Sequence, residues 1–347
     1  MNRSSFDFDR PKELGATAPP EERGLERDGV RLLVRARGVA HHRTFRDLPE
    51  LLTTGDLLVV NESATVAASL PAHGPNGDFL LNLSTEYGDG VWLAEARWGT
   101  GRPGPVPMTR GVPVEAGGAE FHPIGPFPGI ERLWFFSADG DVPRAMQEHG
   151  RPIRYGYVRD AYPLDRYQTI FARVPGSAEM PSAGRPFTPS VVRGLTQRGV
   201  AIAPIVLHAG VSSLEGEPDS ADIPPIYPEP FEVPRATADR VNGTHAAGHR
   251  VVAVGTTVMR ALETAWDRDR VVPRRGFTGL TLAPGRRIRS VDGLITGLHD
   301  PRTSHLALLF AFAGEARVRA DYSAAVQERY LWHEFGDSHL IWAAGAG

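Results

Sequence analysis

Residues 200–207 read VAIAPIVL, an unbroken run of apolar side chains. Such a run is typical of a strand that is buried on both faces of a parallel sheet. Residues 57–60 (LLVV) and 251–254 (VVAV) have the same character. Helical spacing of apolar residues recurs between or after these runs, at residues 189–198, 237–247 and 258–265. This alternation predicts an α/β fold built on a mostly parallel sheet.

Both ends of the chain extend the pattern. Residues 31–38 (RLLVRARG) predict a strand, and residues 45–52 have helical spacing before the LLVV strand. Toward the other end, a strand ends near Ile295, and residues 306–313 and 315–330 predict two helices. The N-terminal part is therefore a β-helix-β start to the same α/β domain.

The middle of the chain has a different texture. Glycine and proline are dense, and four short strand candidates follow one another with turns between them: DFLLNLS, VWLAEARW, GVPVEA and ERLWFFSA. Short strands at this spacing suggest a small antiparallel sheet or barrel. We expect an inserted β-domain at residues 71–150, with a short helix at 142–149, and an α/β domain formed by residues 1–70 and 151–347.

The composition excludes several kinds of site. The 347 residues include no cysteine, which rules out disulfides, cysteine-ligated zinc, iron–sulfur clusters and a thiol nucleophile. The net charge is −3, so no global basic field draws the protein to nucleic acid, although a local arginine patch remains open. Lys12 is the only lysine, and no GxxxxGK[ST] motif occurs. The start lacks the apolar core of a signal peptide, and no apolar run approaches membrane length, so we expect a cytoplasmic protein.

Residues 167–188 (YQTIFARVPGSAEMPSAGRPFT) have neither a helical nor a strand period. They lie between the strand-rich middle and the α/β pattern that follows, as binding loops often do. Turns at PGS (175–177) and PSAG (181–184) place small residues where a backbone can approach a ligand. An ordinary surface loop that joins two subdomains is the alternative interpretation.

Two loops at strand ends carry candidate residues, because ligands of open α/β sheets bind beyond the carboxyl ends of the strands. His208 follows the VAIAPIVL strand as a general acid or base, or as a histidine bonded to a nearby carbonyl. Residues 255–257 (GTT) precede a helix, where they bind a carboxylate or phosphate or simply cap the helix. Arg260, one turn later, pairs with a bound anion or joins Glu263 and Thr264 on a solvated face.

A third loop, residues 297–304 (GLHDPRTS), is the densest in chemistry. It carries a histidine, an aspartate, an arginine and two hydroxyls before a helix, although His299 also suits a capping role and Asp300-Pro301 is ordinary turn chemistry. Residues 212–235 are acidic and proline-rich, with Tyr227 and Glu229 placed to meet a cationic ligand or to form part of a solvated lid. No GxSxG, GxGxxG or HExxH motif and no metal-ligand cluster occurs. From the residues alone we expect a small-molecule site built from loops after the strands.

In order along the chain, the sequence resembles the S-adenosylmethionine:tRNA ribosyltransferase-isomerase family of queuosine biosynthesis. The resemblance runs from FDFD at residue 6 to GDSHLI near the end. Its clearest carriers are FRDLPELLTTGDLLVVNES, RYQTIFARVPGSAEMPSAGRPFT, IVLHAG, VVAVGTTVMRALETA, LITGLHDPRTSHLALLFAFAG and DYSAAVQERYLWHEFGDSHLI. Only residues 72–150 show little beyond strand-rich character.

The resemblance implies a three-layer α/β/α domain with an inserted small β-barrel, S-adenosylmethionine as co-substrate and no metal. The family moves the ribosyl part of S-adenosylmethionine onto the aminomethyl group of a deazaguanine in tRNA, leaving an epoxycyclopentane and releasing adenine and methionine. Because the sulfonium acidifies the adjacent ribose carbon, the site needs a base. The implied catalytic residues are His208, His299 and Glu229. The implied cofactor-binding residues are Ser182, Ala183, Gly184, Phe187, Thr188, Gly210, Tyr227, Thr256, Thr257, Arg260, Arg302 and Thr303.

The departures from the family pattern fall in the loops and not in the strands. PSAGRPFT stands for PTAGLHFT, LHAGVSSL for LHVGLGTF, IYPEPFEV for MHSEWYEV, and NESA for NDTR, which removes an arginine at position 64. Two alternatives to the family reaction therefore stay open: a paralogue that gives the ribosyl group to a small molecule or to water, and a non-catalytic nucleoside- or tRNA-binding protein. If tRNA binds, we expect Arg151, Arg154 and Arg159 to contact it.

Overall fold

A mixed sheet forms the centre of the molecule in the computed structural model, which describes residues 3–36, 38–99, 102, 104–211 and 226–344. Its nine strands in that part of the chain lie in the order β17-β13-β12-β3-β14-β18-β19-β1-β2. Their bounds are β1 (Arg31–Ala36), β2 (Val39–Thr44), β3 (Leu57–Asn61), β12 (Ala201–Leu207), β13 (Glu229–Val233), β14 (Val251–Val254), β17 (Arg274–Thr278), β18 (Gly293–Gly297) and β19 (Ser338–Trp342).

The sheet is less parallel than its apolar runs predict. Strands β12, β3, β14 and β18 run parallel to one another, and β1 runs parallel to β19. The remaining pairings are antiparallel, because β19 runs against β18 and because hairpin-like edges (β1–β2 and β12–β13–β17) complete both sides. The four central parallel strands still bring their carboxyl ends to one edge of the sheet.

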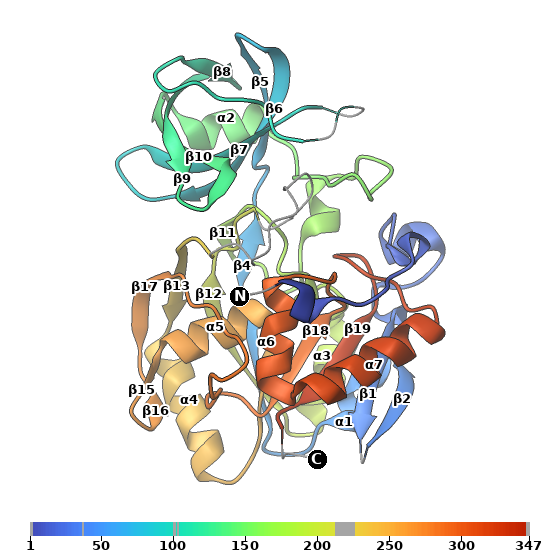
Figure 1. Cartoon of the computed structure of the whole chain (residues 1–347). Helices are drawn as coiled ribbons and strands as arrows, with labels where there is room; N and C mark the ends of the chain where they lie inside the picture. Colours follow the sequence, from blue (N-terminus) through green and yellow to red (C-terminus); the bar gives the residue numbers. More distant parts are fainter. Residues whose placement is uncertain (1–2, 37, 100–101, 103, 212–225, 345–347) are drawn as a thin grey trace.

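Helices cover both faces of the sheet, which confirms the predicted three-layer α/β/α arrangement. Alternate residues of β3 show why: Leu57 and Val59 enter one apolar core, and Leu58 and Val60 enter the other. The first core is closed by α4 (Arg235–Ala246), α5 (Thr256–Thr264), α6 (Ser304–Ala313) and α7 (Glu315–Gln327). The second is closed by α1 (Leu48–Leu51) and α3 (Pro189–Gln197). Figure 1 shows α4 to α7 along one side of the sheet.

Strand β12 does not match the prediction of complete burial on both faces. Ala203, Ile205 and Leu207 are fully buried in the first core. On the opposite face Ile202 packs against the second core only in part, and Pro204 and Val206 are also only partly buried. The apolar run therefore predicted the strand correctly, but it overestimated the burial of the strand's second face.

The predicted inserted barrel is present and closed. Its strands lie in the order β10-β7-β6-β5-β8-β9, and it stands above the sheet in Figure 1. The bounds are β5 (Ser69–Gly74), β6 (Gly77–Glu86), β7 (Val91–Arg97), β8 (Val114–Ala116), β9 (Ala119–Phe127) and β10 (Ile130–Asp139). Helix α2 (Val142–His149) packs Val142 and Ala145 into the barrel's core.

The chain enters and leaves the barrel at adjacent points. The backbone N–H of Ser69 donates to Arg151 O at 2.9 Å, and that of Arg151 donates to Ser69 O at 3.0 Å. Two short ladders complete the strands: β4 (Ser63–Thr65) with β11 (Val174–Ser177), and β15 (Trp266–Asp267) with β16 (Arg270–Val271). Short 3₁₀ helices lie at Arg3–Phe6, Lys12–Leu14, Pro20–Arg23, Arg27–Gly29, Phe45–Asp47, Leu164–Tyr167 and Ser182–Gly184. Within the described ranges, no helix has the length and apolarity to cross a membrane.

Candidate functional site

A cavity of about 840 Å³ opens beyond the carboxyl ends of β14 and β18. Two of the three predicted strand-end loops line it, at residues 255–257 and 296–305. The third loop contributes only Ala209. The rest of the wall comes from segments within residues 10–17, 155–159, 179–183 and 333–334.

The first turn of α5 lies at the cavity with its backbone N–H groups uncapped by a side chain. Gly255 precedes it at φ 100°, a backbone conformation that favours glycine, and Thr256 and Thr257 line the cavity. A Cβ at Gly255 would lie 3.5 Å from the Ala183 Cβ, so residues 182–184 approach this turn closely. A helix N-terminus with free N–H groups favours a bound anion.

His299 stands at the end of β18 and lines the cavity. Its Nε2 lies 2.8 Å from Thr296 Oγ1, and its ring stacks on His305 with centroids 4.7 Å apart and planes at 9°. Trp332 Nε1 donates to His299 O at 3.0 Å, which fixes the backbone. The loop after β18 and the first turn of α6 therefore hold two stacked imidazoles at the cavity.

Burial keeps both imidazoles neutral. It lowers the pKa of His299 well below its usual value, and the neighbouring His305 lowers the pKa of His299 further. Burial also lowers the pKa of His305 to about 4, with a contribution from Arg260. A neutral imidazole can accept a proton, although the lowered pKa makes each ring a weaker base than an ordinary histidine.

His333 is a second imidazole site that sequence reasoning missed. It stacks on Tyr157 with ring centroids 3.9 Å apart and planes at 10°. Its Nδ1 lies 3.5 Å from Asp300 Oδ2, and Arg10 Nε lies 2.9 Å from Asp300 Oδ1. Burial lowers the pKa of His333. No local pattern marks this residue, because its partners come from segments far away in the sequence.

His208 is not among the residues that line the cavity, although the next residue, Ala209, is. Its Nδ1 lies 2.7 Å from Ser63 Oγ, which in turn lies 2.6 Å from Ser177 Oγ. A Cβ at Gly176 would come within 2.7 Å of the imidazole, so the ring packs directly on that glycine. The structure thus places His208 in a hydrogen-bonded junction between β4, β11 and the end of β12.

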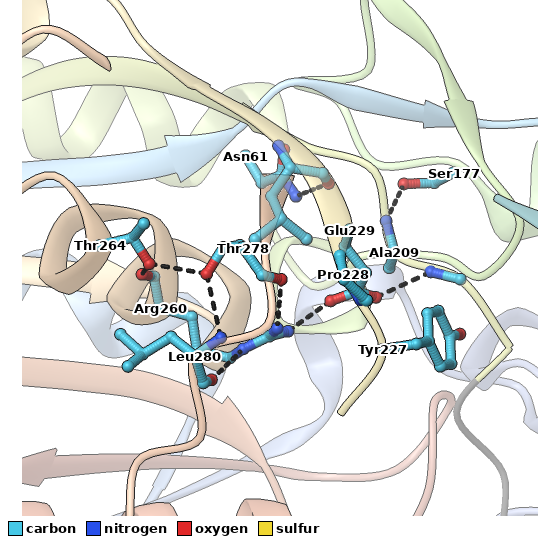
Figure 2. A network of polar contacts seen from close by, with 12 residues as sticks. Asn61, Ser177, Ala209, Tyr227, Pro228, Glu229, Arg260, Thr264, Thr278 and Leu280 are labelled. Carbon is cyan, nitrogen blue, oxygen red and sulfur yellow. Dashed lines mark hydrogen bonds and ion pairs between the residues drawn. The ribbon is translucent and has the colours of Figure 1, made fainter. Parts of the chain in front are cut away.

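Glu229 and Arg260 form a buried ion pair, shown in Figure 2. They are 6% and 7% exposed. Glu229 Oε1 also accepts from the Gly210 backbone N–H at 2.9 Å, and Arg260 donates to the carbonyls of Leu280 at 3.0 Å and Thr278 at 3.3 Å. The pair therefore joins α5 and β13 to the loop after β12.

The alternative that placed Arg260 on a solvated face with Glu263 is wrong. Glu263 is also buried, at 6% exposure. Its Oε1 accepts from the backbone N–H groups of Arg289 and Ser290, each at 2.7 Å. Both charged side chains of α5 are thus held inside the protein.

Tyr227 joins the barrel to the same loop. Its hydroxyl donates to Val211 O at 2.7 Å and accepts from Ser84 Oγ of β6 at 3.0 Å. A Cβ at Gly210 would lie 2.3 Å from that hydroxyl, so only glycine fits there. Tyr227, Gly210, Glu229 and Arg260 are not among the residues that line the cavity.

The loop at residues 182–188 divides into two halves. Ser182 and Ala183 line the cavity. Gly184 packs near Thr169 and Phe171, and Phe187 is fully buried against Phe45 and Phe171 with ring centroids 5.0 and 5.1 Å away. Thr188 caps α3, accepting from Val191 N at 3.3 Å, and donates to Asp28 at 2.7 Å.

The remaining predicted residues lie just before the N-terminus of α6. Thr303 lines the cavity and caps this helix, with its Oγ1 accepting from Leu306 N at 3.3 Å. Arg302 also lines the cavity and pairs with Asp7 at 2.8 Å. Residues 212–225 of the acidic excursion, with the changed residues Ser212, Ser213 and Leu214, lie outside the described residues. The prediction of a solvated lid is wrong for the rest, because Tyr227 and Glu229 are buried and Glu229–Val233 forms β13 of the central sheet.

Several lining residues were not predicted. They are Arg10, Lys12, Thr17, Tyr155, Tyr157, Glu179, His305, His333 and Glu334. Arg159 is both predicted for tRNA and present at the cavity, whereas Arg151 and Arg154 are not on its wall. Among the described residues, no group of three or more His, Asp or Glu side chains is placed to hold a metal ion.

Known proteins match over almost the whole chain. The family model described as queuosine biosynthesis protein matches residues 3–341. The chain is 38% identical over 351 residues to an S-adenosylmethionine:tRNA ribosyltransferase-isomerase of Rubrobacter xylanophilus, covering 99% of both chains. It is also 38% identical to a protein of the same name from Thermus thermophilus, covering 93% of this chain and 96% of that one. The crystal structure of S-adenosylmethionine tRNA ribosyltransferase from Thermotoga maritima is similar at a TM-score of 0.55 and 29% identity, covering 97% and 99%.

Proposed function

Because this chain belongs to the queuosine biosynthesis family of S-adenosylmethionine:tRNA ribosyltransferase-isomerases, we propose that it carries out that reaction on tRNA. The ribosyl part of S-adenosylmethionine is transferred to 7-aminomethyl-7-deazaguanine and isomerised, and adenine and methionine leave. The observation that supports the proposal best is the cavity at the sheet edge, which joins a helix N-terminus to neutral imidazoles. Because its acceptor is tRNA, we infer that the protein acts in the cytoplasm.

S-adenosylmethionine is proposed to bind against α5. The methionine carboxylate suits the free N–H groups of the first turn, with the hydroxyls of Thr256 and Thr257 beside it. Ser182 and Ala183 lie on the adjoining wall. A cavity of about 840 Å³ is within the range of small-molecule sites in proteins and leaves room for an acceptor base.

His299 is proposed as the base that takes the proton from the ribose carbon next to the sulfonium. Of the two predicted histidines, it is the one that lines the cavity. Burial holds its ring neutral, so the lone pair is available near pH 7. The stacked His305 restricts the rotation of the His299 ring.

The predicted residues that do not line the cavity are proposed to position its wall. Glu229 fixes Gly210 through the backbone N–H, and His208 fixes the start of the same loop through Ser63. Tyr227 ties this loop to the barrel. Gly184, Phe187, Thr188 and Arg260 anchor the neighbouring segments in the same way.

The acceptor is proposed to be tRNA. Four cationic side chains line the cavity and its mouth: Arg10, Lys12, Arg159 and Arg302. Arg10 pairs with Asp300 and Arg302 pairs with Asp7, so Lys12 and Arg159 are the stronger candidates for phosphate contacts in a chain of net charge −3. The alternative of a small-molecule acceptor finds no support among the relatives, which are named for tRNA.

Replacing Arg159 by Glu is expected to weaken tRNA binding and to reduce the salt dependence of that binding. Each lost phosphate contact lowers the slope of log K against log salt by about 0.9. The measurement is a titration of labelled tRNA between about 50 and 200 mM salt. Arg151→Glu is the matched variant, since Arg151 is exposed and lies off the cavity. An equal effect of both variants would count against Arg159 as a specific contact.

The reaction itself is tested by incubating the protein with S-adenosylmethionine, alone and with tRNA that carries the aminomethyl-deazaguanine. We expect adenine, methionine and the epoxycyclopentane nucleoside by mass spectrometry only when the modified tRNA is present. Transfer RNA with guanine at the same position is the control. Adenine release without the modified tRNA, or none with it despite S-adenosylmethionine binding, would contradict the proposal.

A further inference from the structure

A basic stretch of sequence lies between β16 and β18. Residues 271–291 contain five arginines and no aspartate or glutamate, in a chain whose net charge is −3. The residues just before it, 267–270, hold two aspartates and two arginines and so add no net charge. Three of the five arginines, Arg286, Arg287 and Arg289, lie close together in the sequence, and all three are exposed. The stretch is therefore a local exception to the acidic balance of the chain.

The part of this stretch that carries the three arginines is fixed against α5. We call residues 280–290 the basic segment. At its start, Arg260 of α5 donates to Leu280 O at 3.0 Å, as Figure 2 shows. At its end, Glu263 Oε1 accepts from the backbone N–H groups of the last two residues, each at 2.7 Å. The basic segment therefore runs along α5 from the middle of the helix to its last turn.

A tight turn and an apolar anchor direct the three arginines toward solvent. The backbone N–H of Arg286 donates to Ala283 O at 3.1 Å across a Pro-Gly pair, and the glycine has φ 94°. This is the sequence and conformation that a type II turn requires. Ile288 then packs against the first core, whereas Arg287 and Arg289 on either side of it are exposed. The backbone thus presents the three side chains together on the surface.

Strand β17 brings a fourth arginine to the same end of α5. Arg274 is exposed and donates to the carbonyl of Thr264, the residue after Glu263. Arg275, by contrast, lies 3.9 Å from a carboxylate oxygen of Glu232. We define the arginine patch as the four residues near the last turn of α5: Arg274, Arg286, Arg287 and Arg289.

The arginine patch lies a short distance from the cavity. Thr256 lines the cavity at the start of α5, and Glu263, which holds the end of the basic segment, is seven residues later. At about 1.5 Å per residue, the two residues lie about 10 Å apart along the helix. A stacked nucleic-acid strand advances about 3.4 Å per nucleotide, so this distance corresponds to about three nucleotides. A strand with one base in the cavity therefore has phosphates within reach of the patch.

We propose that the arginine patch binds the phosphate backbone of the tRNA whose modified base enters the cavity. The inference rests on the proposed function, which supplies tRNA as the partner. Guanidinium groups match phosphate oxygens in geometry as well as in charge. Phosphate contacts of this kind fix the orientation of a nucleic acid without reading its sequence. The patch thus holds the tRNA at a point separate from Arg159 and Lys12, which line the cavity.

The test replaces Arg286 and Arg287 by Gln in one double variant. Both side chains are exposed, and the hydrogen bonds that fix the basic segment to α5 do not involve them. The probe is labelled tRNA that carries the aminomethyl-deazaguanine, titrated between about 50 and 200 mM salt. The slope of log K against log salt should fall by about 0.9 for each lost contact, and the affinity at about 50 mM salt should fall about tenfold or more. The affinity for S-adenosylmethionine should stay unchanged.

The matched control is the double variant Arg193→Gln with Arg198→Gln. These two arginines are exposed on or next to α3, which closes the second core on the opposite face of the sheet. Each double variant removes two positive charges, so a difference between them reports where the charge lies and not how much is lost. The control should keep the tRNA affinity and the salt slope of the wild-type protein.

Three results would overturn the proposal while leaving the proposed function in place, provided that the wild-type protein converts the modified tRNA. One is a salt slope for the Arg286 and Arg287 double variant that equals the wild-type slope. Another is equal weakening of tRNA binding by both double variants. The third is a loss of S-adenosylmethionine affinity that matches the loss of tRNA affinity, which would indicate damage to α5. A wild-type protein that neither binds nor converts the modified tRNA would refute the proposed function and this inference together.

Discussion

Replacing His299 by Ala is expected to lower the rate of adenine release about 10²- to 10⁴-fold, the usual contribution of a positioned general base. The affinity for S-adenosylmethionine should change little, because the helix N-terminus proposed to bind it remains. Single-turnover adenine release measures the chemical step, and equilibrium titration measures the binding. Turnover that survives the substitution would refute the assignment.

The acid side of the pH profile provides an independent check. Burial lowers the pKa of His299 below 6.5, so the base is neutral above that value and is lost as pH falls through the lowered pKa. The wild-type rate should therefore be flat from neutrality down to pH 6.5 and fall only below it. His208→Ala is the contrasting variant, since His208 lies off the cavity and bonds to Ser63. Its adenine release should fall far less than that of His299→Ala.

Arg260→Met is expected to destabilise the protein by about 3–5 kcal/mol, because it leaves the Glu229 carboxylate buried without its cation. Both side chains are less than a tenth exposed, and Arg260 also donates to the carbonyls of Leu280 and Thr278. Methionine keeps most of the apolar volume of the arginine stem. Urea unfolding at neutral pH measures the change in the free energy of unfolding.

The double variant Arg260→Met with Glu229→Gln identifies the cause. Removing both charges should recover part of the loss, since an amide costs less to bury than an unpaired carboxylate. The remaining deficit reflects the carbonyls of Leu280 and Thr278, which lose their donor in both variants. A double variant less stable than Arg260→Met would contradict the expectation.

The layers of the fold were predictable because the residues within a strand indicate which of its faces are buried. Runs such as residues 57–60 and 251–254 place apolar side chains on both faces, and the structure fills both with helices. Strand β9 (Ala119–Phe127) was missed because Pro123, Gly125 and Pro126 break the usual strand composition. Barrel strands tolerate such residues at bulges, and the β9–β10 pairing does shift register twice.

The site was predictable only where its residues follow strand ends. Residues 255–257 and 297–303 lie in loops that leave parallel strands toward one edge, and both line the cavity. The direction in which a side chain points at a strand end was not predictable. His208 also follows a parallel strand, but its ring contacts Ser63 and Gly176 and does not line the cavity.

Long-range partners could not be predicted from one sequence. His333 meets Tyr157 and Asp300 only because β19, α6 and the segment after α2 converge, and no short motif records that convergence. Neither Glu229 nor Arg260 carries a sequence signal that marks it as buried. Their burial follows from the ion pair that they form with each other. Glu179 lies in the central segment 167–188, whose turns were visible although its carboxylate was not singled out.

The paired hydrogen bonds between Ser69 and Arg151 bear on how this architecture evolved. They bring the two ends of the barrel segment together, so a tight turn between Ser69 and Arg151 could replace the barrel without moving the strands on either side. Adding a segment whose ends already meet costs little loop-closure entropy. A change in the length of the barrel segment is therefore expected to leave the register of the central sheet unchanged.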